Sequence, residues 1–218
     1  MKLRFVLLSF VFLIPSFCFC SQTQRCQELL KNRLSHTDKR YCSFLLALGI
    51  LETHGSKTLV ETGTSRCGAS NFIWDGGSTV IFSDWAHKHN AHLYSVDISP
   101  NAVQTSQDAV KAYEPAVTIV CSDSIEFLSK FGKPIDFLYL DSFDYEVGNP
   151  EPSQKHHLKE IEAAYPFLHA NSIVMIDDCD FPCGGKGILV IDYLTKKGWN
   201  VLYEGYQVIL TKRSTNER

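Results

Sequence analysis

The sequence predicts an α/β fold in which helices cover a doubly wound, mostly parallel seven-stranded sheet. One observation is that five short apolar runs, most of them rich in β-branched or aromatic residues, alternate with amphipathic stretches. Strands that alternate with helices form βαβ units and pair into a parallel sheet. The other observation is that only three residues separate two further apolar runs at the end of the chain. So short a connection joins antiparallel strands. The length of 218 residues suits one such domain.

The first 20 residues are predicted to lie outside this fold. Lys2 and Arg4 precede an apolar stretch from Phe5 to Phe19, which Pro15 interrupts. The stretch is shorter than the about 20 apolar residues of a membrane span. Its layout is typical of a secretory signal peptide, here with a cut near Cys20. We therefore expect an exported chain, periplasmic or secreted; an uncut membrane anchor is the alternative.

Residues 21–55 are expected to form an N-terminal helical segment, because leucine and phenylalanine recur at helix-like intervals between residues 23 and 54. Residues 56–213 then form the α/β domain, and residues 214–218 a solvated tail. The expected parallel strands are Thr58–Glu61, Leu93–Asp97, Val117–Cys121, Ile135–Leu140 and Ile173–Ile176. The expected helices between them are Thr79–His89, Pro100–Tyr113, Ser124–Phe131 and Ser153–Leu168.

The end of the chain departs from this alternation. A helix near Lys186–Lys197 is followed by apolar runs at Asn200–Tyr203 and Gln207–Thr211. We expect these two runs to form an antiparallel hairpin at the end of the sheet. Such a hairpin distinguishes the chain from a dinucleotide-binding dehydrogenase, whose strands all run parallel.

Charge and cysteine content limit the possible functions. The net charge is −3 and no basic stripe is present, so nucleic acid is not an expected partner. The six cysteines after residue 20 show no CxxC pair or zinc-like spacing. An exported domain could oxidise some of them, and the sequence does not fix a connectivity. Cys121, which lies in an apolar run, is expected to be a buried thiol.

A glycine-containing turn follows the first expected strand, in the stretch LVETGTSRCG at residues 59–68. Glycine allows a tight turn and lets a ligand approach the backbone closely. Such turns are common after strands. The position adds weight, because ligands bind at the carboxyl ends of strands in an open sheet.

Acids end the next two expected strands. Asp97 could accept both hydroxyls of a ribose, or it could cap the helix that begins near Pro100. Asp123 could meet an adenine amino group, or it could cap the helix that follows it. A glycine turn, an acid and an acid at three successive strand ends together favour a nucleoside-containing ligand.

Residues 58–212 resemble the class I S-adenosylmethionine-dependent methyltransferases, which have a Rossmann-like fold. LVETGTSRCG, LYSVD, CSDS and IDFLYLDSFDY are similar to the family's first four motifs. The resemblance implies S-adenosylmethionine as cofactor. Around its methionine portion it places Glu61, Gly63, Thr64, Ser65 and Gly68. It further implies Asp97 at the ribose, Asp123 and Ser124 at the adenine edge, and Asp141 facing the sulfonium.

One departure from this family pattern is the spacing of 36 residues between Glu61 and Asp97, against roughly 20 in a minimal unit. The surplus contains a turn at residues 75–77 and then a capped helix from Ser78. We interpret it as a lid or substrate loop.

Three acids predict a metal site. Asp141 ends the fourth expected strand, and Asp177 and Asp178 end the fifth. Neighbouring strand ends would bring these carboxylates to one edge of the sheet, where three hard oxygen ligands suit Mg²⁺ or another divalent metal. The arrangement resembles the metal-dependent O-methyltransferases of small molecules and sugars. Asp144 is a possible further ligand. The alternative is that these acids only end a strand and cap a turn.

Candidate general bases lie at the start of the helix after the fourth strand. One of His156, His157 and Lys155 could take the proton from a bound hydroxyl. The run CDFPCGGKG follows the acid pair, and its Gly184, Gly185 and Gly187 permit close approach to a ligand. This run is not a phosphate loop, because it lacks the GxxxxGK[ST] pattern.

The expected function is therefore methyl transfer from S-adenosylmethionine to a hydroxyl of a small molecule or sugar, with divalent-metal assistance. A small-molecule acceptor is the expected partner, and membrane contact is expected only through an uncut N-terminal segment. Two alternatives come from other classes. One is a catalytically silent cofactor- or ligand-binding domain of the same fold. The other is a nucleotide-dependent oxidoreductase, which would carry GxGxxG and no terminal hairpin.

Overall fold

The computed structural model describes residues 16–73 and 77–212, with side chains from residue 21 onward. The strands in these ranges are β1 (Thr58–Thr62), β2 (His92–Asp97), β3 (Val117–Cys121), β4 (Ile135–Leu140), β5 (Leu168–Ile176), β6 (Asn200–Tyr203) and β7 (Val208–Thr211). The α-helices are α1 (Ser16–Leu30), α2 (Tyr41–His54), α3 (Ser78–Lys88), α4 (Pro100–Val110), α5 (Ser124–Ser129), α6 (Glu151–Ala164) and α7 (Ile188–Lys196).

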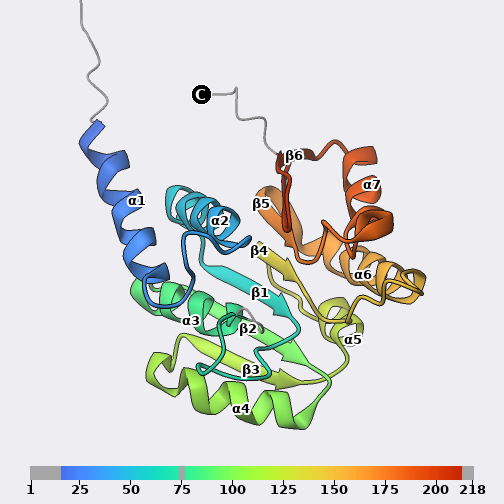
Figure 1. Ribbon diagram of the computed structural model, residues 1–218, viewed down its shortest axis with the longest axis horizontal. Coiled ribbons are helices and arrows are strands. Elements are labelled where there is room, and N and C mark those ends of the chain that lie inside the picture. The colour runs from blue at the N-terminus through green and yellow to red at the C-terminus, as the bar shows by residue number, and fades with distance from the viewer. Residues whose placement is uncertain (1–15, 74–76, 213–218) are drawn as a thin grey trace, which may run out of the picture.

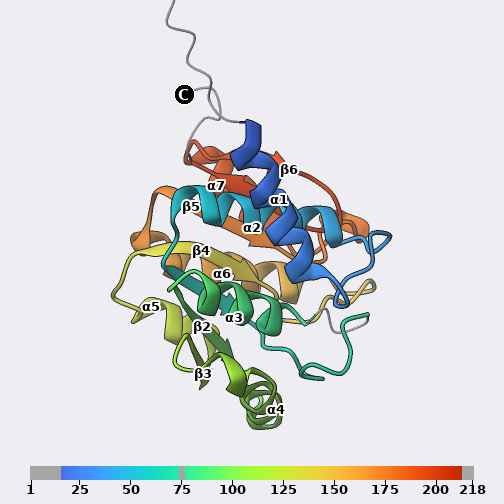
Figure 2. The same cartoon turned by 90° about the vertical axis from the view of Figure 1, so that its left-hand side faces the viewer.

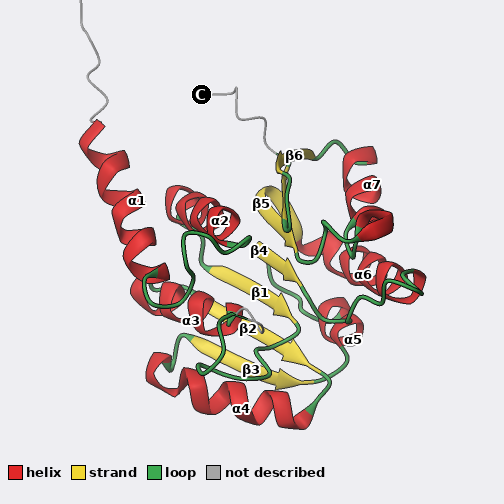
Figure 3. Cartoon of the chain, viewed as in Figure 1, coloured by secondary structure: helices red, strands yellow, loops and turns green. Residues whose placement is uncertain are grey.

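The strands form one sheet in the order β3-β2-β1-β4-β5-β7-β6 (Figure 1). The five strands β1 to β5 are parallel, and β7 pairs antiparallel with both β5 and β6. The predicted fold class is therefore confirmed, with its seven strands and its C-terminal hairpin. The arrowheads of β1, β2 and β3 point to the same edge of the sheet (Figure 3).

Two hydrophobic cores lie on opposite faces of this sheet. The first packs α1, α2 and α3 against the strands and contains Leu59 and Phe82; Figure 2 looks onto this side. The second packs α5, α6 and α7 against the other face and contains Val60 and Ile161. Leu59 and Val60 are neighbours in β1, and they belong to different cores because side chains alternate along a strand.

The N-terminal helical segment differs from the prediction in one respect. The helical pattern between residues 23 and 54 is interrupted after Leu30, and α2 begins only at Tyr41. Asn32 adopts a left-handed backbone conformation, with φ 64°, which asparagine tolerates better than most residues and which ends a helix. The fully buried Phe44 and Leu48 of α2 lie in the first core.

The prediction of a lid between Glu61 and Asp97 is wrong for most of that segment. Residues 78–88 form α3, and each of its residues from Ser78 to Ala86 is buried. Apolar residues on nearly every side of the helix, including Phe82 and Trp85, make it a core element. The helix begins at Ser78 as predicted, but its N-cap, Gly77, makes no side-chain hydrogen bond. Part of the expected turn, residues 74–76, lies outside the described residues.

Two further expectations concern the cysteines and the N-terminus. All six cysteines after residue 20 are free thiols, and Cys121 is exposed at the end of edge strand β3 rather than buried. Among the described residues, no helix has the length and apolarity needed to cross a membrane. Most of the predicted signal peptide, residues 1–15, lies outside the described residues.

Candidate functional site

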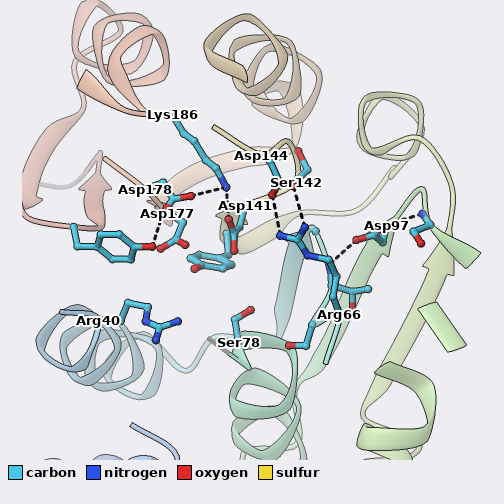
Figure 4. A pocket seen from close by; sticks show the side chains of 16 residues that line it. Arg40, Arg66, Ser78, Asp97, Asp141, Ser142, Asp144, Asp177, Asp178 and Lys186 are labelled. Carbon is cyan, nitrogen blue, oxygen red and sulfur yellow. Dashed lines mark hydrogen bonds and ion pairs between the residues drawn. The ribbon is translucent and has the colours of Figure 1, made fainter. Parts of the chain in front are cut away.

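A pocket with a cavity volume of about 220 Å³ lies at the carboxyl edge of the parallel strands. The loops that follow β1, β2, β4 and β5 line it, together with Arg40 from before α2 and Tyr206 from between β6 and β7 (Figure 4). Strand β1 lies between β2 on one side and β4 on the other. The pocket therefore occupies a topological switch point, where open α/β sheets bind their ligands.

The glycine turn after β1 forms one wall of this pocket. Gly63 has φ +80°, and a Cβ atom added there would lie 2.4 Å from the backbone oxygen of Asp141. Only glycine fits, because the turn crosses directly against the end of β4. Thr64 and Ser65 follow Gly63 in the lining of the pocket. Gly68 packs against α4 through Thr105 and is not among the lining residues.

Asp97 lines the pocket at the end of β2. Its carboxylate accepts hydrogen bonds from the backbone N–H of Thr64 at 3.0 Å and of Ser99 at 2.7 Å. Ser99 is the N-cap of α4, so Asp97 does not cap that helix. A carboxylate has about four lone-pair positions, and these two bonds leave acceptor capacity for the hydroxyls of a ligand.

Asp123 and Ser124, which were expected at the adenine edge of the cofactor, lie outside the pocket lining. Asp123 accepts a hydrogen bond from the backbone N–H of Glu126 at 2.9 Å and is the N-cap of α5. The side chain of Ser124 lies 3.1 Å from His156 Nε2. Neither residue is among those that line the pocket. The capping alternative accounts for Asp123, because an oxygen aimed at the helix N-terminus satisfies a backbone donor there.

Glu61 is fully buried beneath the pocket. Its Oε2 accepts hydrogen bonds from Thr79 Oγ1 at 2.8 Å and from Ser95 Oγ at 2.5 Å. Burial raises the pKa of this carboxyl to about 7. Glu61 does not line the pocket. Its contacts join β1 to β2 and α3 instead.

The three predicted metal ligands come together. Asp141, Asp177 and Asp178 each offer a carboxylate oxygen, and these oxygens lie within 4.8 Å of one another. Leu140 of β4 is in register with Ile176 of β5, so Asp141 and Asp177 follow at the same level of adjacent strands. All three line the pocket. We call them the acid cluster.

A lysine that sequence reasoning did not assign to the site lies within this acid cluster. Lys186 Nζ is 2.5 Å from Asp141 Oδ1 and 3.0 Å from Asp178 Oδ2 (Figure 4). The Lys186 side chain is only 2% exposed. Burial alone would lower its pKa, but the neighbouring carboxylates outweigh burial and raise it above its usual range. Lys186 therefore supplies the acid cluster with a positive counter-charge.

The glycine-rich run after β5 brings Lys186 to this position. Gly185 has φ +55°, and a Cβ atom there would lie 1.9 Å from the backbone oxygen of Asp178. Gln154 of α6 donates hydrogen bonds to the backbone oxygens of Cys183 and Gly185, both at 3.0 Å. Gly185 therefore approaches the protein's own backbone, whereas Gly184 lies against the side chain of Ile188 and Gly187 against that of Cys179. The sequence feature that could have pointed to Lys186 is the run CGGKG, which places a lysine directly after two glycines and close behind the acid pair.

The remaining partners of the acid cluster come from the hairpin. The hydroxyl of Tyr206 donates to Asp178 Oδ1. Gln207 Nε2 donates to Asp177 Oδ1 at 2.6 Å and to the Tyr139 hydroxyl at 2.9 Å. Burial, together with the nearby charge of Asp141, raises the pKa of Asp177 well above its usual range.

The fit of a divalent metal to this arrangement is incomplete. Three carboxylates are the hard oxygen donors that Mg²⁺ prefers. However, the Lys186 ammonium contacts two of them. A divalent ion would share the acid cluster with this ammonium or displace it.

Arg40 is a second pocket residue that sequence reasoning missed. Its guanidinium is 8% exposed and pairs with the Asp38 carboxylate at 2.9 Å. It also donates to the backbone oxygens of Phe72 and Ile73 at 3.0 and 2.9 Å. Arg40 therefore connects the N-terminal segment to the loop before α3, and it adds a positive charge to the pocket lining.

The predicted general bases do not line the pocket. Lys155 is exposed and pairs with Glu151 at 2.5 Å, one helical turn away. His157 is buried, its Nδ1 lies 2.7 Å from the Ser153 carbonyl oxygen, and burial lowers its pKa to about 4. Neither location puts a proton acceptor within reach of a ligand in this pocket. His156 Nε2 lies 3.3 Å from the buried Glu160.

Asp144 lines the outer part of the pocket. Both of its carboxylate oxygens accept hydrogen bonds from the Arg66 guanidinium, at 2.8 and 2.9 Å. This pair joins the loop after β1 to the loop after β4, and it holds the pKa of Asp144 below its usual value. Asp144 does not belong to the acid cluster.

Comparisons with known proteins agree with the fold. Residues 73–179 match a family described as a methyltransferase domain. No curated protein matches the chain.

Among solved structures, the apo form of CalS11, a TDP-rhamnose 3'-O-methyltransferase of calicheamicin biosynthesis, has a TM-score of 0.59 and 16% identity, covering 92% of this chain and 97% of CalS11. The SAH-bound methyltransferase PaMTH1 of Podospora anserina has a TM-score of 0.57 and 12% identity, covering 92% and 89%. MycE methyltransferase, in complex with Mg and SAH, has a TM-score of 0.60 and 13% identity, covering 90% of this chain and 55% of MycE. At such identities these likenesses show the fold.

Proposed function

We propose that this chain, whose residues 73–179 match a methyltransferase domain, is a class I methyltransferase that transfers the methyl group of S-adenosylmethionine to a hydroxyl oxygen of a small molecule or sugar. One observation carries the proposal. A single pocket holds Asp97 and the glycine turn together with the acid cluster and Lys186. The chain can thus hold a nucleoside-containing cofactor and an acceptor hydroxyl in one cavity.

The cofactor end of the pocket is supported by backbone and carboxylate chemistry. Asp97 keeps acceptor capacity for ribose hydroxyls after its two backbone bonds. Gly63, Thr64 and Ser65 line the neighbouring wall, where a ligand can approach the backbone. When bound, S-adenosylmethionine supplies an electrophilic methyl group on its sulfonium. The chain contributes by fixing the orientation of that group, which lowers the entropic cost of the reaction.

The acceptor end is supported by Asp141. One of its oxygens, Oδ1, is paired with Lys186, and its other oxygen, Oδ2, is the atom proposed to accept the proton of the acceptor hydroxyl. Burial raises the pKa of Asp141, and Lys186 partly opposes that rise. A carboxylate with a raised pKa is a stronger base. This proton transfer is why we favour a hydroxyl acceptor.

Two other hypotheses about the function of this pocket compete with the proposal. The first is the predicted divalent metal on Asp141, Asp177 and Asp178, which chelation would reveal as lost activity. The second is a catalytically silent domain, which would bind the cofactor without turnover. The family match to methyltransferases disfavours the predicted oxidoreductase alternative.

The test begins with calorimetry of S-adenosylmethionine binding to wild type and to Asp97→Ala. Loss of the Asp97 hydrogen bonds should cost about 1–3 kcal/mol of binding free energy, which is a loss of roughly 5- to 150-fold in affinity. Asp108→Ala is the matched control, because Asp108 is exposed on α4 and outside the pocket. A panel of diols, phenols and sugars, followed by mass spectrometry, then identifies the acceptor class. A folded wild type that binds no cofactor would reject the proposal.

A further inference from the structure

We propose that the Lys186 ammonium is the resident cation of the acid cluster and takes the position of a divalent metal, so that this methyltransferase binds no such ion there. The inference rests on the proposed function for the role of the cluster as the acceptor end. It concerns a cation supplied by the chain itself.

The position of the ammonium is the first argument. The three acids offer oxygens within 4.8 Å of one another, which is the spacing of a cation site. Lys186 Nζ lies 2.5 Å from Asp141 and 3.0 Å from Asp178, and so bridges the acids of two adjacent strands. The same oxygens, Asp141 Oδ1 and Asp178 Oδ2, are among the donors that a metal would need.

The state of the remaining oxygens is the second argument. Tyr206 donates a hydrogen bond to Asp178 Oδ1, and Gln207 donates to Asp177 Oδ1. With the two oxygens that contact Lys186, four of the six carboxylate oxygens of the cluster are engaged by donors of this chain. A metal bound to these oxygens would have to share them with the donors that already contact them.

The fixed position of Lys186 is the third argument. Its backbone N–H donates to the Asp178 carbonyl oxygen at 3.1 Å, and Gln154 binds the carbonyl oxygen of Gly185 next to it. The side chain is only 2% exposed, so it has little room to move away from the acids. A buried ammonium that stays in place also repels a second cation.

The test is a Mn²⁺ titration followed by electron paramagnetic resonance and calorimetry. Wild type should show no saturable Mn²⁺ binding, and its melting temperature and cofactor affinity should be equal in chelator and in Mg²⁺. Lys186→Met keeps the length of the side chain and removes the charge, so it should gain saturable Mn²⁺ binding at least tenfold tighter than wild type. The double variant Lys186→Met, Asp177→Asn should lose that gain. Lys155→Met, at an exposed lysine, is the matched control and should behave as wild type.

Two results would overturn the inference. One is stoichiometric Mn²⁺ binding by wild type that Asp177→Asn abolishes. The other is a folded Lys186→Met that gains no Mn²⁺ binding, because the acids would then not form a cation site. If Lys186→Met does not fold, the wild-type titration decides alone. Cofactor binding is measured on the same samples, so failure of the proposed function would appear separately, as absent cofactor binding.

Discussion

Glu61 and His157 are two buried titratable side chains with opposite effects on the free energy of unfolding. Burial raises the pKa of Glu61 to about 7 from 4.5, so between these pH values the folded chain keeps a proton that the unfolded chain releases. Its contribution to stability is therefore complete below pH 4.5 and is lost as the pH rises to about 7. Burial lowers the pKa of His157 to about 4 from 6.5, so its contribution is complete above pH 6.5 and is lost as the pH falls to about 4.

Single substitutions should expose these two effects, because they oppose each other over nearly the same pH range. As the pH rises from 4.5 to 7, the free energy of unfolding of Glu61→Gln should increase relative to that of wild type, by on the order of 2–3 kcal/mol. As the pH falls from 6.5 to 4, the free energy of unfolding of His157→Asn should increase relative to that of wild type by a similar amount. Urea unfolding across pH 4 to 8 measures both differences. A stability difference from wild type that is constant with pH would contradict the assigned pKa for that residue.

At the residue scale, the sequence predicted that the three acids lie close together, but it did not predict that the Lys186 ammonium neutralises part of their charge. The acids at the ends of β4 and β5 could be brought together from strand order alone, because parallel neighbours end at one edge. Lys186 could not be placed in the same way. Its position depends on the backbone conformation of the loop after β5, where Gly185 lies against Asp178. Loop conformation has no periodic signal in a sequence.

At the element scale, the loop between β5 and α7 can be tested by comparing two glycines. Gly185 and Gly198 both have positive φ, 55° and 82°, but a Cβ atom at Gly198 meets nothing within 4 Å. Gly198→Ala should therefore cost only about 1–2 kcal/mol, for the left-handed conformation. Gly185→Ala should cost more, since the Cβ atom also collides with the Asp178 backbone, and it should shift Lys186 away from the acid cluster.

Urea unfolding of both variants at one pH measures the difference, and a crystal structure of Gly185→Ala shows the position of Lys186. Equal losses of stability in the two variants would mean that the loop moves aside freely. The glycine-rich run would then not be what fixes the lysine.

Helix α3 shows where a pattern predicts an element but not its role. The strand-and-helix alternation predicted a helix over residues 79–89, and α3 spans 78–88. The long spacing between Glu61 and Asp97 suggested a lid or substrate loop. Burial of α3 depends on contacts with Phe44 and Phe137, which lie 38 residues before and 55 residues after Phe82 in the sequence. Such long-range contacts are not visible in a local window.

At the scale of the whole molecule, the N-terminal helical segment shares a core with the sheet. Cys26, Leu29 and Leu30 of α1 are buried in the first core and follow the predicted cut near Cys20. A chain that begins at Ser21 should therefore unfold with the same free energy as the full chain. A chain that begins at Ser56 should lack a cooperative transition, because the first core would be open to water.

Circular dichroism during heating measures both transitions. Cooperative unfolding of the shorter chain would show that residues 56–213 form a domain by themselves, as the sequence predicted. The export signal stays a prediction for residues 1–20, and mass spectrometry of the mature N-terminus checks it. A mature protein that still begins at Met1 in the cytoplasm would contradict it.

The spacing of the parallel strands also sets a distance across the pocket. Asp97 follows β2 and Asp177 follows β5, and β1 and β4 lie between these strands. Three strand-to-strand steps separate the two acids, which is roughly 14 Å at the hydrogen-bonded spacing of a sheet. Backbone pairing, rather than any loop, sets this length. The loops at the edge of the sheet can therefore change their sequences, and with them the choice of acceptor, while the span across which a methyl group would pass stays constant.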